Sequence, residues 1–497
     1  MCCLRHTFAT EQIPFYQTIM NQKLLKEVYD AENFRKIGHQ LMDDLADHLK
    51  NSLSGKSEKV IRYNAPEDEK AFWEDFLANG EASHFFTEVL RHTTHVHHPN
   101  YIGHQVCAPA PLAALAGLVS ALLNNGMAVY EMGMAPSAIE RIITDLLAKK
   151  IGFGNDARGI LTSGGTLANL TALLAARKAR VPHDVWNEGT SEKLAVMVSE
   201  EAHYCVDRAA KIMGLGEQGI IKIPVTEDFR INLTLLEASL QVAQNNGLRV
   251  FALVGSAPST ATGIYDDLDA LAAFCAKHHL WFHVDGAHGG AAVFSKKYRH
   301  TVKGIEKADS VVIDGHKMML MSTITTALIF KNGAHSHATF SQKADYLLQQ
   351  STDEDWYNLA KRTFECTKTM MSLQWYLLLK TYGEAVFEAN VTTLYDLGQA
   401  FARHIEKQAE LELATNPMSN IVCFRFWKAH LPEDELNRLN LNIRQELLEE
   451  GDFYIVQTRI QGKQYLRTTI MNPFTTMADL EELSSIIVKK GNALLNA

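Results

Sequence analysis

The sequence predicts an α/β protein whose central sheet is largely parallel, on three observations. Short strand candidates recur at 194–199, 250–254, 281–284 and 311–313, the last of them a β-branched, apolar run. Amphipathic patterns with helical spacing separate these runs, at 207–213, 235–245 and 268–278. Strands that alternate with helices indicate βαβ units and a sheet covered on both faces. Polar side chains follow several of the strands, and in such sheets ligands bind beyond the carboxyl ends of the strands.

The chain on either side of this region predicts helices first and a mixed domain last. Apolar residues three and four apart predict helix over 17–51, and Pro66 suits the first turn of another helix. Further helices are expected at 137–150, 167–180 and 363–381. Strands at 421–427 and 465–470, with helices at 432–450 and 477–494, predict a small α+β domain.

These patterns divide the chain into three parts. We expect a helical N-terminal segment at 1–110, a large α/β domain at 111–375 and a small α+β domain at 376–497. The helical segment is thin for its many apolar stripes, which favours packing on a partner subunit.

Composition and charge narrow the class of protein. The 497 residues carry a net charge of −9 and a pI near 6.2, so a nucleic-acid partner is not expected. Seven scattered cysteines without a CxxC pair suit a reducing compartment and offer no zinc framework. Residues 1–6 lack the apolar core of a secretion signal, and the apolar stretch 108–123 is too short for a membrane span. We expect a cytoplasmic protein without a membrane partner, and a buried helix at 108–123.

A histidine-rich stretch, 91–99, invites a metal hypothesis. It contains no Asp or Glu at ligand spacing, and Pro99 favours an extended loop over a helical face. We therefore expect a polar loop that lines a pocket, and no metal site.

Four polar features fall at strand ends or helix starts of the α/β region. Gly164-Gly165-Thr166 opens a helix, where backbone N–H groups and the helix dipole attract a phosphate. His203 follows a strand, and its imidazole suits stacking on a planar ring. Asp285 ends a buried strand, where a carboxylate needs a cationic partner such as a protonated pyridine nitrogen. Lys317 follows another strand, and we expect burial to lower the pKa of its amine and make it a nucleophile.

Each feature has an ordinary alternative: a tight turn, a loop histidine, a capping aspartate and a surface lysine. Together, however, a phosphate seat, a stacking ring, an acid for a ring nitrogen and an amine for an aldehyde describe a pyridoxal phosphate site. Lys317 lies 32 positions after Asp285 (317 − 285), about one strand–helix–strand unit, so both side chains reach one cleft.

The motifs around these residues resemble the group II pyridoxal-dependent amino acid decarboxylases. The matching segments are Thr162-Ser-Gly-Gly-Thr-Leu-Ala-Asn169, Ala202-His203, His283-Val-Asp-Gly-Ala287 and Asp314-Gly-His-Lys317. The similarity runs over about 98–467. It implies an α/β protein of fold type I, pyridoxal 5'-phosphate as the cofactor, and a homodimer with the active site at the subunit interface.

The resemblance also implies a role for each matching residue. Lys317 forms the Schiff base with the cofactor, Asp285 pairs with the pyridine nitrogen, and His203 stacks on the ring. Tyr346 matches a loop tyrosine that protonates the α-carbon, and Arg467 matches an arginine that holds a substrate carboxylate. The remaining cofactor contacts that the resemblance implies are Gly165, Thr166, Ser259, Ala287 and His316.

Departures from the family bear on these roles and on the substrate. Pro258-Ser259-Thr260 stands where many relatives have Gly-Thr-Thr, which makes the Ser259 contact less secure. Met318 follows the lysine where aromatic-specific members have tryptophan. His104 and Gln105 occupy a loop that is aromatic in those members, so His104 is a candidate substrate contact. These differences favour a polar substrate side chain, as in the bacterial L-2,4-diaminobutyrate and glutamate enzymes that the chain resembles.

We therefore predict an enzyme that converts L-2,4-diaminobutyrate to 1,3-diaminopropane and carbon dioxide. Glutamate or aspartate is the alternative substrate, and an aromatic amino acid is a weaker one. An aldehyde synthase on the same fold would differ in the chemistry of the loop tyrosine. A catalytically silent scaffold is disfavoured because His203, Asp285 and Lys317 are all present.

Overall fold

A computed structural model describes residues 15–55, 59–340 and 355–496. The described chain forms two compact units, one of residues 15–55 and 64–93, the other of residues 59–63, 94–340 and 355–496. In this part of the chain, no helix has the length and apolar character needed to cross a membrane.

The smaller unit is helical, as predicted. The helical pattern at 17–51 is two helices, because Asp30 interrupts it and caps the second by accepting N–H bonds from Glu32 and Asn33. Pro66 is the first residue of the third helix. The helices of this unit are α1 (Phe15–Val28), α2 (Ala31–Leu53), α3 (Pro66–Asn79) and α4 (Phe85–Arg91).

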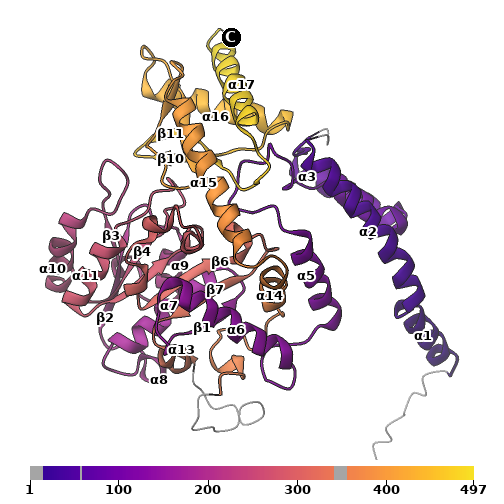
Figure 1. Cartoon of the computed structure of the whole chain (residues 1–497), viewed down its shortest axis with the longest axis horizontal. Coiled ribbons are helices and arrows are strands. Elements are labelled where there is room, and N and C mark those ends of the chain that lie inside the picture. Colours follow the sequence, from indigo (N-terminus) through magenta and orange to yellow (C-terminus); the bar gives the residue numbers. More distant parts are fainter. Residues whose placement is uncertain (1–14, 56–58, 341–354, 497) are drawn as a thin grey trace, which may run out of the picture. The chain divides into compact units, whose positions relative to one another are not determined.

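The larger unit is built on a seven-stranded sheet with the order β1-β7-β6-β5-β4-β2-β3 (Figure 1). Only β7 runs against its neighbours, β1 and β6, so the carboxyl ends of the other six strands meet at one edge. The strands are β1 (Arg158–Thr162), β2 (Lys193–Ser199), β3 (Ile220–Ile223), β4 (Leu248–Ser256), β5 (Trp281–Asp285), β6 (Ser310–Asp314) and β7 (Thr326–Phe330).

Helices cover both faces of this sheet, which explains why its strands are apolar on both sides. One face packs on α7 and α9, and the other on α6, α10 and α11. The helices of this region are α5 (Pro111–Leu123), α6 (Met134–Ile151), α7 (Gly165–Arg180), α8 (Val185–Glu188), α9 (Cys205–Ile212), α10 (Leu236–Asn245), α11 (Leu268–His278), α12 (Gly315–Met318), α13 (Gly333–Phe340) and α14 (Ser372–Tyr382).

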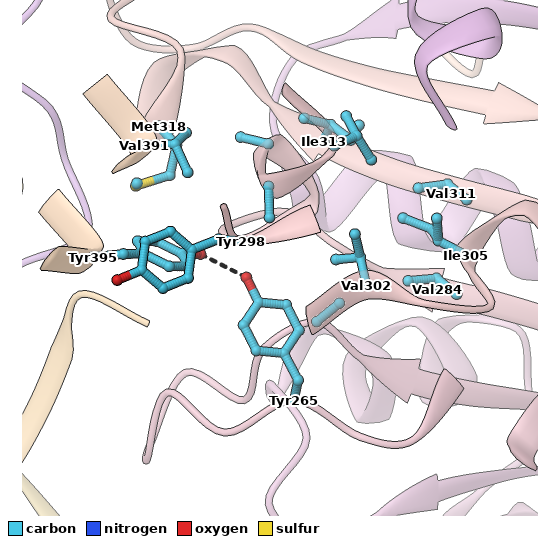
Figure 2. Packing of buried hydrophobic residues seen from close by; sticks show 14 of the residues in the cluster. Tyr265, Val284, Tyr298, Val302, Ile305, Val311, Ile313, Met318, Val391 and Tyr395 are labelled. Carbon is cyan, nitrogen blue, oxygen red and sulfur yellow. Dashed lines mark hydrogen bonds between the residues drawn. The ribbon is translucent and has the colours of Figure 1, made fainter. Parts of the chain in front are cut away.

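The C-terminal part combines helices with a second, smaller sheet, as predicted. Helix α15 (Ala385–Ile405) runs from the region of α14 to a four-stranded antiparallel sheet of order β10-β11-β9-β8 (Figure 1). The buried hydroxyl groups of Tyr265 and Tyr395 lie 2.5 Å apart and join α15 to the loop after β4 (Figure 2). The remaining elements are β8 (Leu411–Leu413), β9 (Ile421–Phe426), α16 (Glu433–Glu450), β10 (Val456–Ile460), β11 (Lys463–Thr469) and α17 (Met477–Leu495).

The structure differs from the sequence prediction in several elements. Strands β3, β7, β8 and β10 and helix α15 were not predicted; β3 is only four residues long, and β7 is a short apolar run of five. The helix expected over 363–381 begins at Ser372, because Lys368 is drawn inward to Glu140 and the Leu161 carbonyl. The helix expected to be buried at 108–123 is α5, and it buries only Ala113 and Ala116.

Candidate active site

The polar residues singled out in the sequence converge where the parallel strands end. Parallel strands present their carboxyl ends at one edge, so the segments that follow β1, β2, β4, β5 and β6 surround a common space. This space is a cavity of about 270 Å³. Its walls comprise Ser163, Gly164, Gly165, Thr166, Asn169, His203, Cys205, Ser256, Pro258, Thr260, Asp285, Ala287, His288, Asp314, His316, Lys317 and Ile324.

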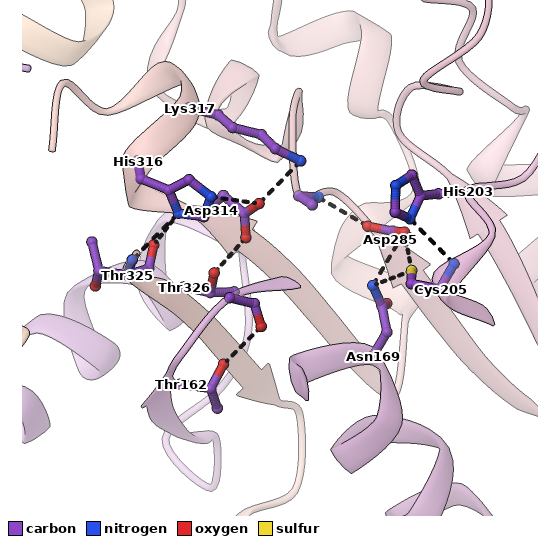
Figure 3. A network of polar contacts seen from close by, with 12 residues as sticks. Thr162, Asn169, His203, Cys205, Asp285, Asp314, His316, Lys317, Thr325 and Thr326 are labelled. Carbon is purple, nitrogen blue, oxygen red and sulfur yellow. Dashed lines mark hydrogen bonds and ion pairs between the residues drawn. The ribbon is translucent and has the colours of Figure 1, made fainter. Parts of the chain in front are cut away.

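Lys317 lies on α12, the single turn that follows β6, and its side chain is 19% exposed. Its Nζ lies 3.0 Å from Oδ2 of Asp314, whose other oxygen accepts a hydrogen bond from the Thr326 hydroxyl (Figure 3). Burial lowers the pKa of Lys317, but the charges of Asp314 and Asp285 outweigh it, and the net pKa is raised. The expectation of a lowered pKa is therefore wrong for the protein without a ligand, because burial comes with two carboxylates.

Asp285 is the last residue of β5, and its carboxylate accepts hydrogen bonds from two nitrogen donors and from the Cys205 thiol at 3.9 Å. The backbone N–H of Ala287 donates to Oδ1 at 3.2 Å, and Nδ2 of Asn169 donates to Oδ2 at 3.2 Å (Figure 3). Asn169 lies one turn into α7, four residues after Gly165, so it faces the same cavity. The carboxylate is thus oriented as an acceptor at the cavity wall.

His203 presents a neutral, fixed ring beside Asp285 (Figure 3). The backbone N–H of Cys205 donates to its Nδ1 at 3.3 Å, which leaves the proton on Nε2. Burial lowers the pKa of His203, although the neighbouring Asp285 charge opposes that effect. A neutral imidazole of defined orientation can stack on a flat group.

The start of α7 is open to an anion. No side chain caps this helix, and Gly164 before it has a φ of +99°, a conformation that residues with side chains rarely adopt. A Cβ atom on Gly165 would lie 3.2 Å from Oδ1 of Asp314 and 3.4 Å from Cβ of Ala287. Only glycine therefore leaves this corner of the cavity clear for a ligand to approach the helix N-terminus.

Several sequence-predicted residues do not line the cavity. Ser259 is buried and donates to the Glu201 carbonyl, while its neighbours Pro258 and Thr260 form part of the wall. Arg467 lies behind the cavity wall, where its Nη1 donates to the carbonyl of the wall residue Thr260 at 2.7 Å. Partial burial lowers the pKa of His104, and the nearby charges of Arg467 and Arg444 lower it further. Tyr346 lies outside the described residues.

The histidine-rich loop takes another place than expected. None of its four histidines lines the cavity. Nε2 of His97 lies 2.9 Å from the Pro109 carbonyl, and Asn100 donates its N–H to Nδ1 of His98. His97 and His98 thus form hydrogen bonds with neighbouring backbone groups.

His288 lines the cavity and was not among the predicted site residues. Its Nε2 lies 2.7 Å from Oδ1 of Asn420, whose amide nitrogen donates to the Ile470 carbonyl. His288 therefore carries its proton on Nε2, and its Nδ1 has no partner among the described residues. Burial, with the nearby charge of Lys317, lowers the pKa of His288 to about 3. The sequence did offer a signal for this residue, since His288 follows Asp285 by only three positions.

Comparison with known proteins adds to this geometry. The family model described as pyridoxal-dependent decarboxylase conserved domain matches residues 67–427. The aromatic-L-amino-acid decarboxylase of Bacillus atrophaeus is 28% identical, over 92% of this chain and 95% of that protein. The L-2,4-diaminobutyrate decarboxylase of Acinetobacter baumannii is 27% identical, over 82% of this chain and 83% of that protein.

A solved structure supports the same grouping. The glutamate decarboxylase domain of the diaminobutyrate-pyruvate transaminase and L-2,4-diaminobutyrate decarboxylase from Vibrio parahaemolyticus matches with a TM-score of 0.79. It is 26% identical, and the match covers 91% of this chain and 96% of that one.

Proposed function

The chain belongs to the pyridoxal-dependent decarboxylase family, and from that premise we propose that it converts L-2,4-diaminobutyrate to 1,3-diaminopropane and carbon dioxide. The predicted family, cofactor and fold type I architecture are confirmed, as is the decarboxylation of an amino acid. The relatives above are named for different amino acids at nearly equal identity, so the substrate is argued from the cavity.

The residues of the cavity fit pyridoxal phosphate. The uncapped start of α7, with Gly165 and Thr166, offers N–H groups to its phosphate. Asp285 is oriented to accept a hydrogen bond from its ring nitrogen, and Lys317 brings an amine to the same space for its aldehyde. His203 and Ala287 would bound the ring on opposite faces, and His316 would lie beside the lysine.

These residues divide the work of decarboxylation. When bound, the cofactor takes up the electron pair that remains at the substrate α-carbon after carbon dioxide leaves. Asp285 would keep a proton on the ring nitrogen, and His203 would stack on one face of the ring and fix its orientation. Arg467, anchored on the Thr260 carbonyl, would receive a substrate carboxylate, with Ser259 supporting the same segment. We assign the final proton donation to Tyr346.

One observation carries the choice of substrate: the unpartnered Nδ1 of His288 is a buried acceptor in the cavity wall. A buried acceptor without a donor is costly, so a ligand with N–H groups gains by satisfying it. The side-chain ammonium of diaminobutyrate supplies such donors, whereas a side-chain carboxylate supplies none. A phenylalanine side chain, which has no N–H or O–H group, would also leave the lone pair unsatisfied.

Glutamate or aspartate is the second candidate, on a different observation. The charges of Arg467 and Arg444 both act on His104, so two guanidinium groups lie near this loop. If Arg467 binds one carboxylate of the substrate, the positive charge of Arg444 would attract the other. His104 would then be the neutral neighbour of an acidic side chain.

A panel of L-amino acids tests the proposal by product analysis. We expect the highest kcat/KM for diaminobutyrate, with 1,3-diaminopropane as product. His288→Phe should lower that value about 10- to 100-fold, since a hydrogen bond to a charged group contributes about 1.5–3 kcal/mol. His288→Gln, which keeps an acceptor, should recover part of it. A wild-type preference for glutamate or aspartate would instead support the second candidate.

A loss-of-cofactor control accompanies the panel. Lys317→Ala should lose both turnover and the absorption band of covalently held cofactor. If this variant still held the cofactor covalently, the assignment of the lysine would be wrong.

We also propose a homodimer, with the active site completed by the partner subunit. Helix α5 supports this proposal because Leu118, Val119, Leu122 and Leu123 are all exposed along it. The division at 1–110, 111–375 and 376–497 remains our proposal for the domains. For the compartment we propose the cytoplasm, where thiols stay reduced, in agreement with the free cysteines of the described chain.

A further inference from the structure

A line of polar side chains is buried behind Asp285. Successive residues of a strand point to opposite faces, so Trp281, His283 and Asp285 share one face of β5. Ser310 pairs with His283 in the next strand, β6, and Asn169 approaches from α7. All of these except Asp285 are at most 1% exposed.

Hydrogen bonds join these side chains without a gap. Nε1 of Trp281 donates to the Ser310 hydroxyl at 2.9 Å, and that oxygen lies 2.8 Å from Nδ1 of His283. Nε2 of His283 lies 2.7 Å from Oδ1 of Asn169, whose Nδ2 donates to Asp285 at 3.2 Å.

The carboxylate end and the neutral ring of His283 determine the direction of these bonds. A carboxylate can only accept, so Asn169 turns its N–H group toward Asp285 and its oxygen toward His283, which donates from Nε2. Burial lowers the pKa of His283 to about 4, so its Nδ1 carries no proton and accepts from the Ser310 hydroxyl. The indole N–H of Trp281 donates to the same hydroxyl. If His283 did not donate, the amide could turn its oxygen toward the carboxylate and lose that bond.

We infer that Ser310, His283 and Asn169 form a relay that positions the Asp285 carboxylate for the ring nitrogen of the cofactor. The inference rests on the proposed roles of Asp285 and Lys317. These three are positioning residues, since none is assigned a contact with the reacting atoms. The relay also explains three polar side chains in an otherwise apolar core, where each would be costly without a partner.

Binding of two cofactor forms tests the relay directly. The probes are pyridoxal phosphate and its analogue with carbon in place of the ring nitrogen, whose dissociation constants are measured on the purified full chain. We expect Asn169→Leu to weaken binding of pyridoxal phosphate about 10- to 100-fold, the size of effect that loss of an outer hydrogen-bond partner has at metal sites. Ser310→Ala should act in the same direction with a smaller factor. The analogue should change less than about threefold in both variants, because it cannot bond to Asp285.

Thr171→Val is the matched control. Thr171 is buried on the same helix, two residues from Asn169, and its hydroxyl has no partner among the described residues. This variant should bind both probes as the wild type does. Equal weakening of both probes in the Asn169 and Ser310 variants would overturn the relay and leave these residues a packing role only. Equal affinity of the wild type for the two probes would also overturn it, whereas a wild type that binds neither would refute the proposed function itself.

Discussion

At the scale of single residues, the charge of Lys317 depends on its neighbours more than on its burial. Asp314 precedes it by three residues and lies 3.0 Å from its Nζ. Both carboxylates near it favour the ammonium form, so the amine must lose a proton before it can bind an aldehyde. Asp314 therefore orients the lysine and favours its protonated, non-nucleophilic form.

This arrangement predicts a pH dependence of cofactor binding. Because the pKa of Lys317 is raised, the neutral fraction of its amine grows as pH rises through the neutral and alkaline range. The rate of loading with pyridoxal phosphate should grow with it. Asp314→Asn removes one carboxylate and should move this profile to lower pH, by about 1 unit or more. Loading followed by absorbance at several pH values measures the shift.

The control for this experiment is Thr326→Ser, which keeps the hydroxyl that donates to Asp314. Its profile should match that of the wild type. An Asp314→Asn profile that does not move, or moves to higher pH, would contradict the role of Asp314.

At the scale of elements, local patterns predicted the strands that carry the site but not all that surrounds them. Asp285 and Lys317 were found because each lies at the end of a strand-like run, and strand ends converge in parallel sheets. The alternation of Trp281, His283 and Asp285 was equally visible in the sequence. The inserted strand β7 and the late start of α14 were not, because contacts distant in sequence decide them.

The segment before α14 shows how such a contact acts. Lys368 and Glu140 form an ion pair at 2.5 Å with each side chain 1% exposed, and Glu140 also accepts the N–H of Leu161. The pair joins this segment to α6 and to β1, the strand that leads into Gly164 and Gly165. Removing one partner from a buried pair leaves an uncompensated charge.

We therefore expect Lys368→Met to lower the free energy of unfolding by about 3–5 kcal/mol. Adding Glu140→Gln should recover part of that loss, because the stranded carboxylate is gone. Denaturant unfolding of the wild type and both variants measures these differences. A loss below about 1 kcal/mol for the single variant would show that the pair contributes little.

At the scale of the whole molecule, helix α5 differs most from the sequence prediction, because an apolar stretch expected to be buried has an exposed face. The stretch reads as core, yet Leu118 is 50% exposed and Leu122 is 63% exposed, one helical turn apart. Sequence periodicity finds an apolar face but does not say which chain covers it. If a second copy places the same face against this one, the interface buries both leucines of each copy.

The homodimer thus predicts the effect of charges on this face. Each leucine contributes about 1.5–3 kcal/mol when buried, so Leu118→Asp with Leu122→Asp should weaken association by about a thousandfold or more. Sedimentation equilibrium should then show a dimer for the wild type and a monomer for the double variant. Val242→Asp changes an equally exposed residue on α10 and should leave the dimer intact. If the wild type and the double variant sediment as the same species, the face of α5 does not join two copies of the chain.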